Sequence, residues 1–124
     1  MSRILIVDDM STHLLLLQTI LEEDGYKTIM LDDSTQVINT MHNDKVDIVL
    51  LDIMMPGMDG FKVLEEIRKD EKLKKIPVII ISARTDSWSI KNALDRGAFD
   101  YITKPINIQD LRNKVKYAFN EIGN

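Results

Sequence analysis

The chain has 124 residues, the length of one ordinary domain, so we expect residues 1–124 to form a single domain. It is 44% hydrophobic and 29% charged, which predicts a folded core, and it has no cysteine, which excludes disulfides and cysteine-based metal or redox sites. A net charge of −4 gives no electrostatic reason for this domain to bind nucleic acid directly. No apolar run is long enough to span a membrane and the N-terminus lacks the layout of a signal peptide, so we expect a cytoplasmic protein without membrane association.

Strand and helix patterns alternate along the whole chain. In chain order the predicted elements are a strand at 4–7, a helix between Ser11 and Gly25, a strand at 27–31, a helix over 34–42, a strand at 48–51, a helix over 59–69, a strand at 78–81, a helix over 86–96, a strand at 100–103 and a helix capped by Asn107. The runs at 4–7, 48–51 and 78–81 are apolar on both faces, which is typical of central parallel strands. Five βα units predict an α/β protein with a flavodoxin-like, doubly wound (βα)5 sandwich, whose five-stranded parallel sheet has the order 2-1-3-4-5 and helices on both faces.

The side-chain pattern also predicts which helix faces are buried and which residues begin the helices. In the first helix one face carries Leu16, Leu17, Ile20 and Leu21, and in the last helix one apolar stripe carries Ile108, Leu111, Val115 and Phe119. Leu15 instead points among polar residues of the first helix. We expect the helices to begin with N-caps at Ser11, Asp32 or Asp33, Asp59 and Asn107.

Polar side chains follow four of the predicted strands, at the point where each strand ends. Asp8 and Asp9 follow the first strand, Asp52 the third, Ser82 the fourth and Lys104 the fifth. The carboxyl ends of parallel strands share one edge of the sheet, and neighbouring strands lie about 4.8 Å apart, so the three aspartates should converge with Ser82 beside Asp52. Lys104 starts about 10 Å from Asp52, a gap that its flexible stem can close.

This group of side chains has the chemistry of phosphoryl transfer. Three close carboxylates repel one another unless a cation or a proton intervenes, and an oxygen-only cluster favours a hard ion, most naturally Mg²⁺. A backbone carbonyl near Met54 would add a ligand. Asp52 would attack phosphorus, the metal and Lys104 would neutralise the developing charge, and the Ser82 hydroxyl would bond a phosphoryl oxygen.

Four segments in this order and spacing resemble the receiver domain of two-component response regulators: ILIVDD at 4–9, LLDIMMPGMDG at 50–60, IIISA at 79–83 and GAFDYITKP at 97–105. The resemblance covers essentially the whole chain. It implies that Asp52 is the phosphoacceptor, that Asp9 binds the metal directly, that Asp8 acts mainly through water, and that the Met54 carbonyl is a ligand. It also implies that Asp52 faces solvent at the strand end, with Pro56 and Gly57 turning the chain away.

The resemblance further implies a switch and a set of partners. Ser82 corresponds to the switch hydroxyl, Lys104 to the invariant lysine, followed by a cis peptide to Pro105, and Tyr101 to the aromatic that rotates when Ser82 moves inward. A histidine kinase or histidine phosphotransfer protein would donate its phosphoryl group to Asp52. The surface of the fourth helix, fifth strand and fifth helix would then change for a downstream output domain or protein, or for a phosphorylation-dependent homodimer. Such a domain is a signalling module that catalyses its own phosphoryl transfer and dephosphorylation.

Several alternatives stay open at this point. Leu15 is either a contact for the phosphodonor or a lone exposed leucine, and Trp88 either packs on the core or lies on the output face. We expect His13 and His42 to be helix-surface residues without a catalytic or metal role. A haloacid-dehalogenase-type phosphatase is one alternative, but it would need a second acid at the position of Met54. A flavodoxin-like cofactor binder is another, but it would need a phosphate-cradling loop after the first strand, where the chain instead has the acidic segment DDMST.

Overall fold

Five parallel strands form the central sheet in the computed structural model of the chain, which describes residues 2–55 and 58–122. The strands are β1 (Arg3–Val7), β2 (Lys27–Leu31), β3 (Ile48–Asp52), β6 (Val78–Ser82) and β7 (Asp100–Thr103). Their order in the sheet is β2-β1-β3-β6-β7. Counted by βα unit, this is the order 2-1-3-4-5, so the predicted topology is confirmed.

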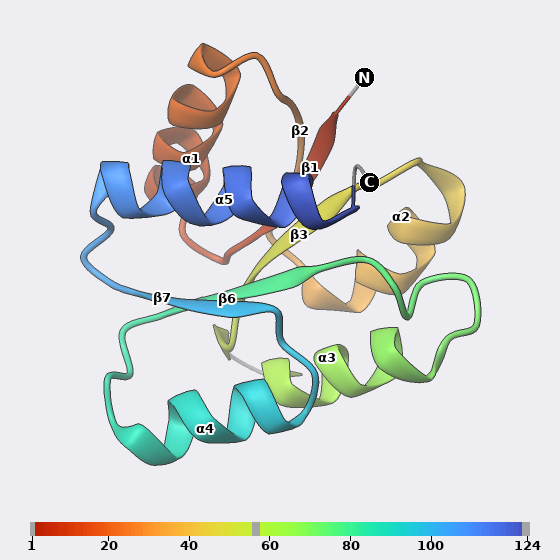
Figure 1. Cartoon of the computed structure of the whole chain (residues 1–124). Coiled ribbons are helices and arrows are strands. Elements are labelled where there is room, and N and C mark those ends of the chain that lie inside the picture. Colours follow the sequence, from red (N-terminus) through yellow and green to blue (C-terminus); the bar gives the residue numbers. More distant parts are fainter. Residues whose placement is uncertain (1, 56–57, 123–124) are drawn as a thin grey trace.

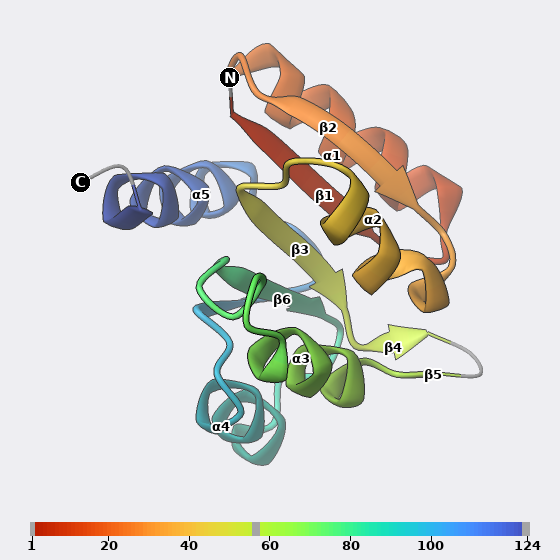
Figure 2. The ribbon, with the colours of Figure 1, turned by 90° about the vertical axis from the view of Figure 1, so that its right-hand side faces the viewer.

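Helices cover both faces of the sheet, as Figures 1 and 2 show. One face packs on α1 (Ser11–Glu23) and α5 (Ile108–Ile122), and the other on α2 (Val37–Asn43), α3 (Gly60–Lys69) and α4 (Ser87–Asp95). A short 3-10 helix, η1 (Ser34–Gln36), precedes α2. Successive side chains of a strand point to opposite faces, so Ile4 and Ile6 of β1 join the α1–α5 core while Leu5 and Val7 join the other. All residues of β3 and β6 are buried, which confirms them as central strands.

A small antiparallel pair that the sequence did not predict follows the central strand β3. It consists of β4 (Met54–Met55) and β5 (Met58–Asp59), and Figure 2 shows it beyond the end of β3. Pro56 and Gly57, expected to turn the chain away from Asp52, lie outside the described residues. At Gly60 an added Cβ would lie 2.4 Å from the Cα of Ile53, so only glycine lets α3 start this close to the end of β3.

The helix ends agree with the expected caps except at α1. Asp33 and Asp59 accept hydrogen bonds from the backbone N–H groups of Thr35 and Phe61, and Asn107 accepts one from Asp110. The Ser11 cap is wrong, because Met10 is the N-cap residue of α1 and no side-chain capping bond forms there. Positive φ angles of 90° at Gly25 and 102° at Gly97 follow the ends of α1 and α4, a conformation that glycine adopts at little cost.

Two predicted buried positions are exposed instead. In α1 the buried residues are Leu14, Leu17, Ile20 and Leu21, so Leu14 takes the place expected for Leu16. Leu14 and Leu16 each lie one turn from a buried residue, Leu17 and Ile20 respectively, so the rotation of α1 against β1 and α5 decides which of the two is buried. Helix α5 packs on the sheet only from Leu111 onward, so Ile108, the first residue of the helix, is exposed.

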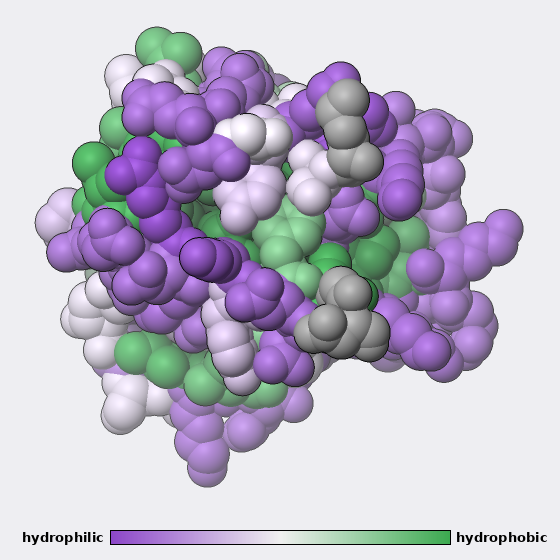
Figure 3. Space-filling view, turned by 45° about the horizontal axis from the view of Figure 1, so that its top comes forward, coloured by the Kyte–Doolittle hydropathy of each residue, from purple (hydrophilic) through white to green (hydrophobic). Residues whose placement is uncertain are grey.

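The outer surface is predominantly polar where Figure 3 shows it. Hydrophilic side chains make up most of that face, and hydrophobic patches are visible between them. No helix within the described residues combines the length and the apolar character needed to cross a membrane.

Candidate functional site

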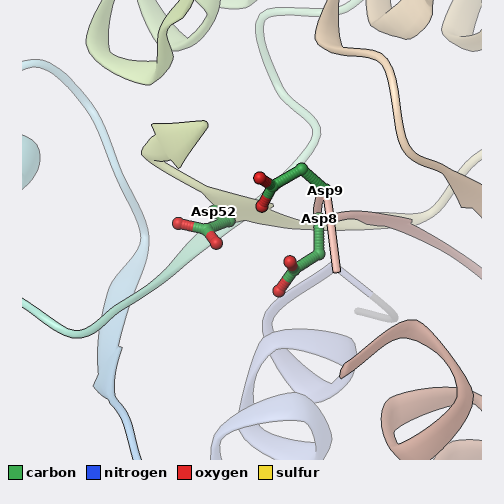
Figure 4. A group of neighbouring side chains, drawn as sticks. All are labelled: Asp8, Asp9 and Asp52. Atoms are coloured by element: carbon green, nitrogen blue, oxygen red, sulfur yellow. The ribbon is translucent and has the colours of Figure 1, made fainter. Parts of the chain in front are cut away.

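The carboxyl ends of β1 and β3 bring three aspartates together, as Figure 4 shows. Asp8 and Asp9 follow β1, and Asp52 is the last residue of β3. One carboxylate oxygen of each lies within 4.8 Å of the other two, so the predicted convergence is confirmed. The expectation that Asp52 faces solvent is wrong, because Asp52 is 5% exposed and Asp8 only 1%. Asp9 is the exposed member of the group.

The two buried carboxylates are held by the same pattern of hydrogen bonds. Oδ1 of Asp8 accepts a hydrogen bond from the N–H of Met10 at 2.9 Å, and Oδ1 of Asp52 accepts one from the N–H of Met54 at 2.8 Å. Oδ2 of each carboxylate accepts from the Lys104 ammonium, at 3.1 Å for Asp8 and 2.9 Å for Asp52. Both acids therefore have fixed orientations, and one cation offsets two buried negative charges.

Lys104 follows β7, two strands from β3, and its side chain reaches the acids along the carboxyl edge of the sheet, as the sequence predicted. Its N–H donates to the carbonyl of Ser82 at 2.8 Å, and the peptide to Pro105 is cis, as expected. Burial disfavours the ammonium form, but hydrogen bonds and charge interactions with Asp52 and Asp8 outweigh this cost and raise the pKa of Lys104 above its ordinary value. Lys104 therefore carries its charge at neutral pH.

The carboxylate of Asp9 is the open part of the site. Among residues 2–55 and 58–122 it has no hydrogen-bond or ion-pair partner, so its oxygens are free to bind a cation. Together with Asp8 and Asp52 it offers three hard oxygen donors, which fit a small divalent ion. Met54 lies at the rim with an exposed side chain. The cluster is therefore able to hold a metal ion.

Hydrogen bonds connect the two residues expected to act as a switch. Ser82 is fully buried, one residue beyond Ile81, which pairs with Asp52 across the sheet. Its Oγ accepts a hydrogen bond from the N–H of Arg84 at 3.1 Å. The carbonyl of Arg84 in turn accepts one from the hydroxyl of Tyr101 at 2.8 Å, and Tyr101 is buried. The loop after β6 thus links Ser82 to Tyr101.

His13 lies in the site, although we expected it on the helix surface. It belongs to the first turn of α1, and its Nδ1 is 3.2 Å from Oδ2 of Asp8 and 3.0 Å from Nζ of Lys104. A helix that follows a parallel strand starts above the carboxyl edge of the sheet, and this position was the signal available in the sequence. His42 is exposed, as expected, and pairs with Asp70 at 2.6 Å.

The two suggested contact residues are exposed. Leu15 is 62% exposed on α1, as its polar neighbours predicted, and Met10 and Leu16 are exposed near it in sequence. Trp88, at the start of α4, is 63% exposed. Its ring packs edge-on against Phe61 of α3, with centroids 6.3 Å apart, so it lies over the α3–α4 surface rather than in the core.

Sequence comparison identifies relatives over nearly the whole chain. The family model of the response regulator receiver domain matches residues 4–116. The transcriptional regulatory protein KdpE of Staphylococcus aureus is 40% identical over 115 residues, which are 93% of this chain and 48% of that protein. Protein PilH of Pseudomonas aeruginosa is 35% identical over 111 residues, which are 90% of this chain and 92% of that protein. The chain spans about half the length of the first curated relatives that it matches.

Solved structures with the same fold are likewise response regulators or receiver domains. A two-component response regulator from Clostridium difficile superposes with a TM-score of 0.91 at 27% identity, over 100% of both chains. A response regulator receiver domain protein from Clostridium thermocellum superposes with a TM-score of 0.87 at 33% identity, over 99% of this chain and 98% of the other. The receiver domain of a signal transduction histidine kinase from Syntrophus aciditrophicus superposes with a TM-score of 0.89 at 31% identity, over 98% of this chain and 92% of the other.

Proposed function

This chain belongs to the receiver domain family of two-component response regulators, and on that premise we propose that Asp52 accepts a phosphoryl group in a Mg²⁺-dependent reaction. The donor is a phosphohistidine of a histidine kinase or histidine phosphotransfer protein. The observation that carries the proposal is the Lys104 ammonium, which contacts both buried carboxylates beside Asp9, whose carboxylate has no partner among the described residues. Nucleophile, cation and open acidic ligand thus occupy one strand-end site.

Each residue of the site has a part in the transfer. A bound Mg²⁺ ion would neutralise charge on the phosphoryl oxygens, held by Asp9, Asp52 and the Met54 carbonyl, with Asp8 acting through water. A carboxylate oxygen of Asp52 attacks phosphorus and forms the new O–P bond. The P–N bond of the phosphohistidine breaks, and its electron pair stays on the imidazole nitrogen of the donor. Lys104 leaves the attacking carboxylate and donates to a phosphoryl oxygen.

Phosphorylation would be transmitted through the loop after β6. The Ser82 hydroxyl turns to donate to a phosphoryl oxygen and thereby leaves the N–H of Arg84, its present partner. Because the carbonyl of Arg84 accepts the hydrogen bond of the Tyr101 hydroxyl, a shift of this loop removes that acceptor and frees Tyr101 to rotate. The α4–β7–α5 surface then changes for a downstream output domain or protein, or for a second copy of the chain.

Exposed hydrophobic side chains suggest where partners bind. Leu15, with its exposed neighbours Met10 and Leu16, would contact the helices of the phosphodonor beside the acidic site. Trp88, exposed over the α3–α4 surface beside the output face, would contact a partner that extends from the output face across α4. The cytoplasmic location and the absence of direct nucleic-acid contact by this domain stay predictions from the sequence.

Intact-mass measurement tests the assignment of Asp52. The wild-type protein, incubated with acetyl phosphate and Mg²⁺, should gain one phosphoryl group, and Asp52→Asn should gain none. Asp59→Asn is the matched control, because Asp59 caps α3 outside the acidic cluster and asparagine keeps the cap. Equal modification of wild type and Asp52→Asn would remove Asp52 as the acceptor.

A further inference from the structure

His13 is the third partner of the Lys104 ammonium. The Nζ atom lies 2.9 Å from Oδ2 of Asp52, 3.0 Å from Nδ1 of His13 and 3.1 Å from Oδ2 of Asp8. An ammonium group has three N–H donors and no acceptor, so these three contacts use all of its hydrogen-bonding capacity. The lysine is therefore held from three directions, by residues that follow β1, end β3 and begin α1.

The contact with Lys104 determines the role of the ring nitrogen. Because an ammonium can only donate, Nδ1 of His13 accepts, and the ring proton resides on Nε2. Oδ2 of Asp8 is 3.2 Å from the same nitrogen but is an acceptor too, and Lys104 already supplies its hydrogen bond. Nδ1 cannot accept from Lys104 and donate to Asp8 at once, and the shorter contact to a cation favours the accepting form.

The other two acceptors are needed elsewhere during the reaction. Asp52 carries the incoming phosphoryl group, and Asp8 belongs to the acidic set around the cation. His13 has neither task. We propose that His13 is a positioning residue for phosphoryl transfer, which keeps the Lys104 ammonium over the acidic site while Asp52 is phosphorylated. This inference rests on the proposed function.

The location of His13 suits it to this task. Its side chain is 30% exposed and stands in the first turn of α1, whose next residue, Leu14, is anchored in the core. The four-carbon stem of Lys104, by contrast, is flexible, and without the His13 acceptor its ammonium would be free to turn toward water. An acceptor on a rigid helix therefore limits the positions that the ammonium samples.

Two substitutions of His13 separate the accepting atom from the bulk of the ring. His13→Leu keeps an apolar side chain but removes the acceptor, whereas His13→Asn places an amide oxygen near the position of Nδ1. With acetyl phosphate and Mg²⁺, His13→Leu should be phosphorylated about tenfold more slowly than wild type, and His13→Asn should recover to within about threefold. His42→Leu, which removes the histidine paired with Asp70, is the control and should keep the wild-type rate.

A spectroscopic readout tests the same hydrogen bond without turnover. In ¹⁵N NMR spectra of the histidine rings at neutral pH, His13 should have an unprotonated Nδ1 and a protonated Nε2. Lys104→Met should shift the His13 ring signals and leave those of His42 unchanged. A protonated Nδ1, or His13 signals that do not respond to Lys104→Met, would overturn the inference.

The failures of the two proposals are distinguishable. If wild-type protein gains no phosphoryl group, the proposed function itself is contradicted. If wild type is phosphorylated and His13→Leu reacts as fast, the proposed function stands and the role of His13 is refuted. If His13→Asn is as slow as His13→Leu, an accepting atom at this position is not what matters, which also refutes it.

Discussion

Replacing Lys104 with methionine tests the electrostatics on which the site depends. Within residues 2–55 and 58–122, Lys104 is the only lysine or arginine that forms an ion pair with Asp8 or Asp52. Methionine keeps most of the stem but removes the charge, which leaves two carboxylates, 1% and 5% exposed, each with one backbone hydrogen bond, and Asp8 also with the His13 ring. Removing one partner of a buried ion pair costs about 3–5 kcal/mol, and the open side at Asp9 favours the lower end. We therefore expect a loss of about 3 kcal/mol, or roughly 10 °C in Tm for a chain of this length.

Urea unfolding in a metal-free buffer with a chelator measures this loss. Lys74→Met is the matched control, because Lys74 pairs with Glu71 at 3.1 Å on the exposed surface, and such pairs contribute less than about 1 kcal/mol. Adding Mg²⁺ should narrow the gap between wild type and Lys104→Met, because the ion supplies the missing positive charge. If both variants lose the same small amount without metal, the buried carboxylates do not depend on Lys104 and the reasoning is refuted.

Three further predictions concern the metal, the packing and the pH dependence. Mg²⁺ should raise the Tm of wild type, and Asp9→Ala should abolish most of that rise, because Asp9 is the exposed acid of the cluster and has no partner within the part of the chain that the structure describes. Gly60→Ala should lower the free energy of unfolding by about 1–3 kcal/mol in urea titrations, because its Cβ would clash with the backbone of Ile53. Hydrogen bonds from the backbone and side chain of Ser89 lower the pKa of Asp86 in the folded protein. The stability from Asp86 is therefore present above the unfolded pKa of about 3.9 and lost as pH falls through the lower folded value. Asp86→Asn, which keeps the cap, should lose less stability over that acidic range in urea titrations.

Each of these expectations has an outcome that contradicts it. An undiminished Mg²⁺ response in Asp9→Ala would show that the cation binds without that carboxylate. Wild-type stability of Gly60→Ala would show that α3 can move away from β3 without cost. Identical acid sensitivity of wild type and Asp86→Asn would show that the Ser89 hydrogen bonds do not favour the charged form of Asp86.

The strands and the acidic cluster were predictable because their signals are local. The apolar runs of β1, β3 and β6 each indicate a buried strand, and parallel packing alone places their carboxyl ends at one edge. From that rule it follows that Asp8, Asp9 and Asp52 meet and that Lys104 reaches them, and the structure confirms both. The caps at Asp33 and Asp59 were likewise readable from residue type and position.

The errors arose where the outcome depends on how distant segments pack. Leu14 rather than Leu16 is buried because the rotation of α1 about its own axis is set by its contacts with β1 and α5. The buried Asp52 accepts a hydrogen bond from Lys104, which is 52 residues away in the chain. No run of neighbouring residues carries this information.

By itself, the sequence determined the order of elements, the topology of the sheet and the edge at which the acids gather, because hydrophobic periodicity and strand-end positions encode them. Only the tertiary structure decided that Asp52 is buried and that His13 faces the lysine. The physical reason is that a side chain's burial and its hydrogen-bond partners are set by groups from other segments, which come together only when the helices pack on the sheet.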